Sequence, residues 1–175
     1  MITVRRAESE SDLDHVRRLV AGFIAWLKVL FADDIQRIDA YFHSLQPELA
    51  SLPGQYAPPA GRLLLALCDD RVTGVVAMRD LGGGTCEMKR MFVDTKSHGA
   101  GVGRALAEAL ISEARDAHYA RMRLDTSHRQ VAAIRLYRRL GFKEIQPYYE
   151  ISAELRSGLT FMELPLQEPD TPVPQ

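Results

Sequence analysis

The chain has few cysteines, almost no net charge and no long hydrophobic run, and each shortage excludes a class of protein. Its two cysteines, Cys68 and Cys86, are isolated in strand-like runs, which disfavours a disulfide framework or a metal pair and indicates reduced core residues. A formal net charge of −1 argues against a general nucleic-acid binder. No apolar run approaches the roughly 18 residues of a membrane span, and residues 1–6 lack the charged-then-apolar order of a signal peptide. We therefore expect a cytoplasmic protein with no nucleic-acid or membrane partner.

The length and composition suit one globular domain. The 175 residues fall within the size of a single domain, and 46% of them are apolar, which is enough for a sizeable core. Residues 167–175 contain three prolines and little that could be buried. We interpret residues 1–166 as the domain and residues 167–175 as a Pro-rich C-terminal tail.

Hydrophobic periodicity predicts a chain of the α/β class. Ser11 and Asp14 indicate the start of a helix with a buried face of period 3.6. A second helix begins near Asp33 or Asp34, and Pro47 weakens its continuation. A third helix begins directly after Gly103, and a fourth spans Gln130–Leu140. The predicted strands are Ile2–Arg5, Arg62–Cys68, Val72–Arg79, Thr85–Val93, Arg121–Asp125, Phe142–Tyr149 and Thr160–Leu166.

Three glycines at alternate positions, Gly99, Gly101 and Gly103, lie between a predicted strand and a predicted helix. Glycine lets the backbone pass close to a ligand, and the first N–H groups of the helix point into the same space. This combination predicts an anion site of the kind that holds a pyrophosphate. A P-loop would need Lys and then Ser or Thr after the last glycine. A dinucleotide fingerprint would need Gly or Ala where Arg104 or Leu106 stands.

Two motifs resemble those of the GNAT acetyltransferases. The family's acetyl-CoA loop reads Gln/Arg-x-x-Gly-x-Gly/Ala, and this chain departs from it at the first position, which is His98. The family's next signature is Asn-x-x-Ala-x-x-x-Tyr-x-x-x-Gly-Phe. It is matched, with Gln in place of Asn, by Gln130, Ala133, Tyr137, Gly141 and Phe142. Two spaced motifs in the right order are far more specific than either alone.

The resemblance implies the GNAT fold, an α/β architecture with a mixed central sheet of six to seven strands flanked by about four helices. It also implies an N-acetyltransferase that uses acetyl-CoA as cosubstrate. The acetyl group would pass to a primary amine by direct attack in a ternary complex. The family's backbone contacts to pantetheine fall at Met91, Phe92 and Val93, and its diphosphate contacts fall at His98, Gly99, Ala100, Gly101, Val102, Gly103 and Arg104.

The resemblance gives Tyr137 and Glu87 catalytic roles. Tyr137 is the candidate proton donor to the departing sulfur, because a phenol with an ordinary pKa of about 10 stays protonated at neutral pH. The alternative is an aromatic ring that packs against the sheet. Glu87 is the candidate base, acting directly or through a water. The alternative is a solvated carboxylate paired with Lys89 or Arg90.

Strand alternation decides which side chains share a face with Glu87. It places Glu87, Lys89, Met91 and Val93 on one face and Cys86, Met88, Arg90 and Phe92 on the other. A bulge would break this parity, and many GNAT proteins have one in the corresponding strand.

Two side chains of the glycine loop have alternative interpretations. His98 either donates to a phosphate or only occupies the loop, and the second is favoured because several backbone N–H groups outweigh one histidine. Arg104 either reaches a phosphate or pairs with Glu108 on a solvated helix face. No histidine has the spacing of a metal ligand, so no metal site is expected.

The sequence leaves the acceptor open. A small amine, an amino acid, an antibiotic or a peptide amine would each fit, and a homodimer is an open alternative to a monomer. The pair Tyr148 and Tyr149 and the aromatic residues of the first two helices lie where the family often has its acceptor pocket, although ordinary packing is favoured for each. The rival function is a non-catalytic module that senses acetyl-CoA or binds another partner through the same loop.

Overall fold

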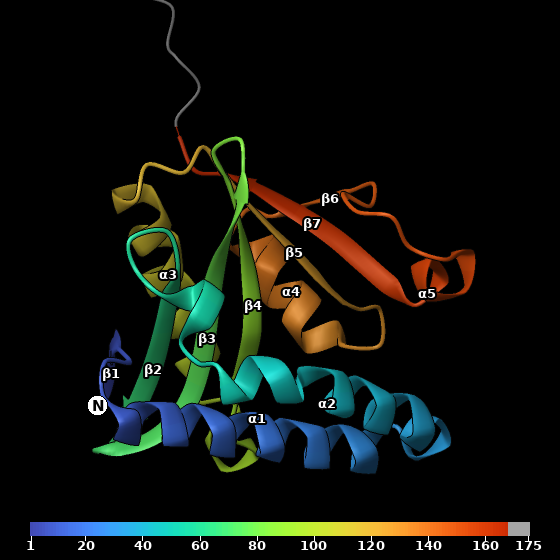
Figure 1. Ribbon diagram of the computed structural model, residues 1–175, viewed down its shortest axis with the longest axis horizontal. Coiled ribbons are helices and arrows are strands. Elements are labelled where there is room, and N and C mark those ends of the chain that lie inside the picture. The colour runs from blue at the N-terminus through green and yellow to red at the C-terminus, as the bar shows by residue number, and fades with distance from the viewer. Residues whose placement is uncertain (168–175) are drawn as a thin grey trace, which may run out of the picture.

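The computed structural model describes residues 1–167 as a mixed sheet between two layers of helices (Figure 1). Nearly all of the predicted tail therefore lies outside the described residues. The strands are β1 (Ile2–Arg6), β2 (Arg62–Cys68), β3 (Arg71–Gly82), β4 (Thr85–Val93), β5 (Arg121–Ser127), β6 (Lys143–Ile145) and β7 (Leu159–Pro165). The α-helices are α1 (Glu10–Leu30), α2 (Ile35–Ala50), α3 (Val102–Asp116), α4 (Val131–Arg139) and α5 (Ala153–Ser157).

The seven strands lie in the order β1-β2-β3-β4-β5-β7-β6, and β4 with β5 is the parallel pair among the described strands. These two strands pair only from Thr85–Glu87 to Arg121–Arg123. Beyond Glu87 they diverge, as Figure 1 shows, and β4 continues for six residues without β5 beside it. The divergence leaves backbone groups of β4 without a strand partner in the middle of the sheet.

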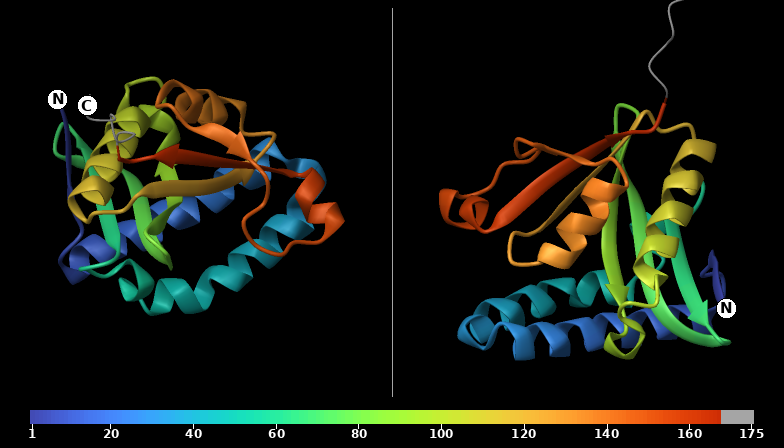
Figure 2. Two further views of the ribbon diagram at one scale, coloured as in Figure 1. Left: turned by 90° about the horizontal axis from the view of Figure 1, so that it is seen from above. Right: turned by 180° about the vertical axis from the view of Figure 1, so that it is seen from behind.

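Helices cover both faces of the sheet (Figure 2). On one face α3 packs over β1–β4, and its buried residues, among them Leu106 and Leu110, share a core with Met88 and Met122. On the other face α1 and α2 lie side by side across the sheet and enclose a second core. Their far halves extend past β4 and meet through Ile24, Leu27, Phe31 and Ile38.

The start of α1 differs from the sequence prediction. Ser9, not Ser11, is the N-cap, and it forms a capping box with Asp12. The sequence prediction of Ser11 with Asp14 was therefore wrong by two residues. Asp12 is buried, and its carboxylate also accepts two hydrogen bonds from Arg5, at 3.0 and 2.7 Å. This ion pair selects the earlier cap, because it ties α1 to the first strand.

The second helix also corrects the sequence prediction, since α2 continues through Pro47 to Ala50. A proline inside a helix removes one backbone hydrogen bond. Two contacts from the following turn keep the chain helical: Leu49 is buried in the core, and Glu48 binds an arginine of β4. Tertiary packing therefore outweighs the local effect of the proline.

The remaining predicted elements are confirmed, with one further exception. The predicted strand Phe142–Tyr149 is reduced to β6, because Pro147 lacks a backbone donor and Tyr148 turns toward the sheet interior. The short helix α5 has no counterpart among the predicted elements. Among residues 1–167, no helix is both long and apolar enough to cross a membrane.

The Asp12→Asn variant should lose about 1 kcal/mol of unfolding free energy at pH 7. Hydrogen bonds from Arg5 hold the pKa of Asp12 well below its usual range, so its stabilisation is present above the unfolded-state pKa of about 3.9 and disappears as pH falls through the lower folded-state value. Urea unfolding should show a smaller difference in unfolding free energy between wild type and variant at pH 3 than at pH 7. Asp14→Asn is the control and should change stability by less than about 0.5 kcal/mol. An equal loss at both pH values would contradict the role of the charge.

Candidate active site

A bulge in β4 shapes the site. Ala77 pairs with Lys89 but Val75 pairs with Phe92, so β4 has one residue more than β3 between these pairs. Arg90 lies in this interval with a φ of 55°, in the left-handed region that a side chain rarely adopts. The predicted alternation therefore holds only as far as Lys89. Beyond it the prediction was wrong: Met91 and Val93 pack on the α3 face, and Phe92 packs on the α1 face.

The bulge is held by an ion pair to α2. Arg90 donates from Nε and Nη2 to the two oxygens of Glu48, at 2.7 and 2.8 Å, and from Nη1 to the Tyr41 hydroxyl at 3.0 Å. Burial of Glu48 opposes its charge, but the hydrogen bonds from Arg90 outweigh this, and the pKa of Glu48 lies below its ordinary value. Two parallel N–H···O bonds fix both groups in position.

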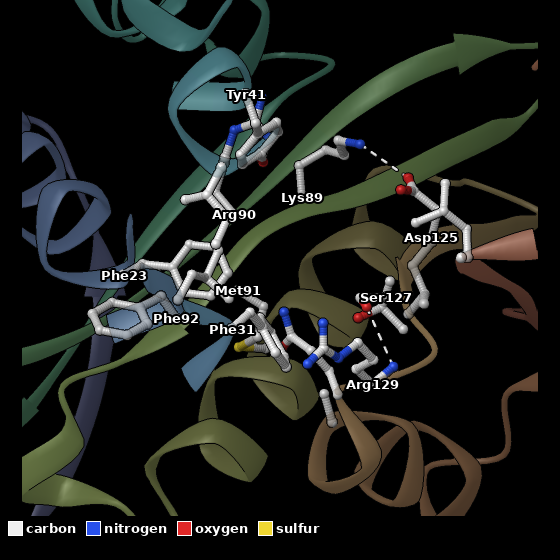
Figure 3. Close-up of a pocket in the computed structure, with 18 of the residues that line it drawn as sticks. Phe23, Phe31, Tyr41, Lys89, Arg90, Met91, Phe92, Asp125, Ser127 and Arg129 are labelled. Carbon is white, nitrogen blue, oxygen red and sulfur yellow. Dashed lines mark hydrogen bonds and ion pairs between the residues drawn. The ribbon is translucent and has the colours of Figure 1, made fainter. Parts of the chain in front are cut away.

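The gap between β4 and β5 opens into a cavity of about 410 Å³ (Figure 3). Helices α1 and α2 form one wall, and β4, β5 and α4 form the other. The wall is mostly apolar, with charged side chains at a few positions. The apolar residues include Phe23, Leu27, Phe31, Ile38, Met91 and Phe92.

Tyr137 is buried and lines this cavity from α4. Its ring contacts that of Phe142, with centroids 5.7 Å apart. Burial, and to a lesser degree the charge of Asp125, raises the pKa of Tyr137 above its usual value. The phenol therefore keeps its proton at neutral pH, and it faces the space where the two strands diverge.

Glu87 lies behind the cavity wall. Its side chain is fully buried, and its two oxygens accept hydrogen bonds from Arg79 Nε and Tyr148 Oη, both at 2.6 Å. The ammonium group of Lys89 lies 3.7 Å away. The alternative of a carboxylate paired with Lys89 is confirmed as to the partner, but its solvation was wrong. The placement also disfavours direct proton transfer to Glu87, because other side chains occupy its oxygens.

Asp125 and Lys89 also line the cavity, although the sequence predicted a catalytic role for neither of them. Asp125 lies near the end of β5, and its carboxylate accepts a hydrogen bond from Lys89 Nζ at 3.0 Å (Figure 3). The only sequence signal was a carboxylate near the end of the strand that precedes the Tyr137 helix. Its importance follows from the divergence of β4 and β5, which brings it to the same cavity as Tyr137.

The glycine loop has the predicted form. Gly99 and Gly101 have φ values of 80° and 87°, so both need the freedom of glycine, and Gly101 is the N-cap of α3. Gly99, Ala100 and Gly101 are exposed. The first turn of α3 therefore presents its unpaired N–H groups to an accessible surface beside the end of β4.

His98 and Arg104 both have partners within the protein. The His98 ring nitrogen Nε2 lies 3.0 Å from the Val93 carbonyl oxygen, which can only accept, so Nε2 carries the proton. The His98 ring also packs edge-on against the Trp26 ring, with their centroids 6.0 Å apart. Arg104 donates to Glu108 at 2.7 Å on the helix surface. These contacts favour the interpretation in which backbone groups are the principal anion ligands.

The aromatic residues singled out for the acceptor pocket separate into two groups. Phe31 and Tyr41 line the cavity. Tyr148 instead donates to Glu87, and Tyr149 packs against Phe161 at 5.3 Å between centroids. Trp26 lines a separate cavity on the other side of α1.

Comparison with known proteins decides the family. The sequence profile of the Acetyltransferase (GNAT) family matches residues 26–142. The chain belongs to the GNAT acetyltransferase family. An uncharacterized N-acetyltransferase of Schizosaccharomyces pombe is 34% identical over 85% of this chain and 86% of its own length. The IAA acetyltransferase of Azospirillum brasilense is 35% identical over 75% of this chain and 88% of its own length.

A solved GNAT-like structure agrees with this assignment. The protein yncA of Salmonella typhimurium, solved with its cofactor acetyl-CoA, aligns with a TM-score of 0.60 and 25% identity over 98% of each chain. The predicted GNAT fold, the acetyltransferase class and the use of acetyl-CoA as cosubstrate are thereby confirmed. In a GNAT enzyme the exposed loop amides and the unpaired edge of β4 are suited to the diphosphate and the pantetheine arm of that cosubstrate.

Replacement of Gly101 by alanine tests the loop. A Cβ there would meet only the Ile2 side chain, at 3.9 Å, but the φ of 87° is one that a side chain rarely adopts, so the loop backbone should shift at a cost of roughly 1–2 kcal/mol. The shift moves the N–H groups at the start of α3, and we expect acetyl-CoA affinity to fall at least about tenfold by calorimetry.

His98→Ala is the matched change, and it should weaken binding less than about threefold because backbone N–H groups remain in place. The opposite ranking of the two variants would assign the phosphate contact to the imidazole.

Proposed function

We propose that the protein acetylates a primary amine by direct attack on acetyl-CoA in a ternary complex. The observation that carries the proposal is the single cavity that Tyr137, Asp125 and the unpaired edge of β4 share. A direct reaction needs a donor at the carbonyl oxygen, a proton source for sulfur and an acceptor for the amine proton. Residues of β4, β5 and α4, in one wall of the cavity, supply all three groups.

The proton and electron changes balance within this set. The amine nitrogen attacks the acetyl carbon, a C–N bond forms and the C–S bond breaks. A backbone N–H of Met91, Phe92 or Val93 stabilises the carbonyl oxygen as it gains charge. Asp125 takes one proton from the entering ammonium group, directly or through water, which frees the nitrogen lone pair for attack. Tyr137 gives its proton to the departing sulfur and is reprotonated by the second proton that the nitrogen loses, while Asp125 releases its proton to solvent.

Asp125 is proposed as the amine-facing carboxylate in place of Glu87. An ammonium group that enters the cavity meets the charge of Asp125, whereas Glu87 is sealed behind Arg79 and Tyr148. Lys89 lies between the two carboxylates, 3.0 Å from Asp125 and 3.7 Å from Glu87. Glu87 would then act indirectly, by fixing Lys89 and through it the position of Asp125.

Among the described residues that line the cavity there is no cysteine to carry a covalent acetyl-enzyme. Burial raises the pKa of Cys86 to about 12, so its thiol is inert at neutral pH, and it does not line the cavity. Direct attack therefore fits the site better than a two-step route. Both cysteines are free, which also supports the proposed cytoplasmic location. A homodimer stays a prediction.

The Tyr137→Phe variant tests the acid. The ring still packs on Phe142, so acetyl-CoA affinity should change less than about twofold, while kcat should fall at least about a hundredfold. Release of free CoA thiol against a panel of amines gives the rate. Tyr119→Phe removes a hydroxyl from the same core but outside the cavity and should leave kcat nearly unchanged. Because the pKa of Tyr137 is raised, wild-type kcat should not decline from its ionisation below about pH 10.

A pair of isosteric substitutions separates the two carboxylates. Asp125→Asn should lower kcat/KM at least about a hundredfold with an unchanged unfolding midpoint. Glu87→Gln removes a buried charge that two donors need, so it should lower the unfolding free energy by about 1–3 kcal/mol and reduce the rate less. The reverse pattern of rates, with a folded Glu87→Gln protein, would restore Glu87 as the base. Full activity in both variants would remove both carboxylates from the mechanism, whereas acetyl-CoA binding without turnover in wild type would favour the sensor.

A further inference from the structure

The cavity carries opposite charges in two places. Where β4 and β5 diverge, Asp125 lies beside Lys89 and in the same wall as Tyr137. Where the turn between α1 and α2 faces the start of α4, Arg129 and Arg37 line the cavity together with Asp34. Figure 3 shows Lys89 with Asp125 and Arg129 with Phe31 in separate parts of the cavity wall.

Arg129 presents a cation to the cavity while its counterion lies on the solvent side. Its guanidinium lies 4.1 Å from the centroid of the Phe31 ring, and both residues line the cavity. Its Nη1 and Nη2 contact Asp33 at 3.4 and 3.2 Å. Asp33 does not line the cavity, and its side chain is 73% exposed. An exposed pair of this kind is weak, so a carboxylate in the cavity can compete with Asp33 for the guanidinium.

The other charges of the wall do not cancel this cation. Arg90 is neutralised from outside the cavity by Glu48, and Lys89 is matched by Asp125. Arg37 lies 3.6 Å from Asp34, so this pair contributes one charge of each sign. The partner of Arg129, Asp33, lies outside the cavity. The guanidinium of Arg129 itself is stacked on the Phe31 ring, which fixes the orientation of its plane.

The size and lining of the cavity limit the kind of acceptor that can extend from Asp125 to Arg129. About 410 Å³ suits a small molecule, and aromatic and aliphatic side chains form most of the wall between Asp125 and Arg129. A polycation is disfavoured, because it would meet Arg129 and Arg37. A neutral apolar amine would offer the guanidinium no anion from the cavity side.

We propose that the acceptor is an amino carboxylate with an apolar or aromatic body, its amine at Asp125 and its carboxylate at Arg129. This assignment rests on the proposed function and names the acceptor class for it. The apolar body would lie against Phe31 and Phe23. Arg129 is thus a specificity-determining residue that binds the carboxylate of the acceptor, while the reacting nitrogen lies at Asp125.

Two matched pairs of amines test the proposal with the full chain. L-phenylalanine and phenethylamine differ only by a carboxylate near the amine, and 4-(aminomethyl)benzoate and benzylamine differ only by one far from it. We expect the carboxylate-bearing member of at least one pair to have a kcat/KM at least about tenfold higher. The readout is CoA thiol release with mass-spectrometric detection of the acetylated amine.

Three variants show whether Arg129 is the cause. Arg129→Gln should bring the ratio within the preferred pair close to one, chiefly through KM. Arg123→Gln is the matched control, because Arg123 also pairs with an acid, Glu163, and lies over an aromatic ring, but it does not line the cavity. It should keep the ratio. Asp33→Asn frees Arg129 and should raise the ratio, whereas a purely structural role for the Asp33–Arg129 pair would make it resemble Arg129→Gln.

The outcomes distinguish this inference from the proposed function. Equal transfer to both members of each pair, or preference for the members without carboxylate, would overturn the acceptor class and leave N-acetyltransfer standing. Transfer to none of the four amines would also overturn it. The proposed function would fail as well if spermidine and a lysine-containing peptide gave no CoA release.

Discussion

The ion pair between Arg90 and Glu48 is the interaction on which the site depends. A side chain at positive φ costs roughly 1–2 kcal/mol, and the two hydrogen bonds from the half-buried Arg90 to Glu48 offset that cost. The bulge that they hold turns Phe92 toward α1 and Met91 toward α3. The same pair fixes the last turn of α2 against β4, so the cavity wall and the reactive edge of the strand are positioned by one contact.

Much of the fold could be predicted because its signals are local. The short apolar runs of β2, β3 and β4, the period of α3 and the glycine after α4 each follow from neighbouring residues. The errors have non-local causes. Arg5 reaches Asp12 of α1 from strand β1 and selects the earlier cap, and Glu48 reaches Arg90 from beyond a proline. Neither partner is visible from the periodicity of the segment that it stabilises.

The candidate site likewise contains residues that local motifs predict and residues whose position depends on distant contacts. The glycine loop and Tyr137 could be found because their motifs have a fixed spacing along the chain. Asp125 and Arg129 carry no such spacing, and their roles exist only because β4 and β5 separate beyond Glu87. For Glu87 the sequence could indicate a strand carboxylate but not its burial, since Tyr148 covers it from 61 residues away.

The buried charges behind the cavity affect the geometry of the site more than the stability of the fold. Desolvated ion pairs contribute little net stability, so a network of Arg79, Glu87 and Lys89 is a costly way to fill the interior of a sheet. Its effect on geometry is larger. Glu87 and Asp125 both attract Lys89, which keeps the Asp125 carboxylate beside the cavity instead of free to rotate toward solvent. A carboxylate held by one cation and facing an apolar wall attracts an ammonium group more strongly than one in water, because the surroundings screen less. In the proposed reaction, the opening between β4 and β5 thus provides both a passage for the thioester and the low-polarity setting in which Asp125 and Tyr137 exchange protons with the reactants.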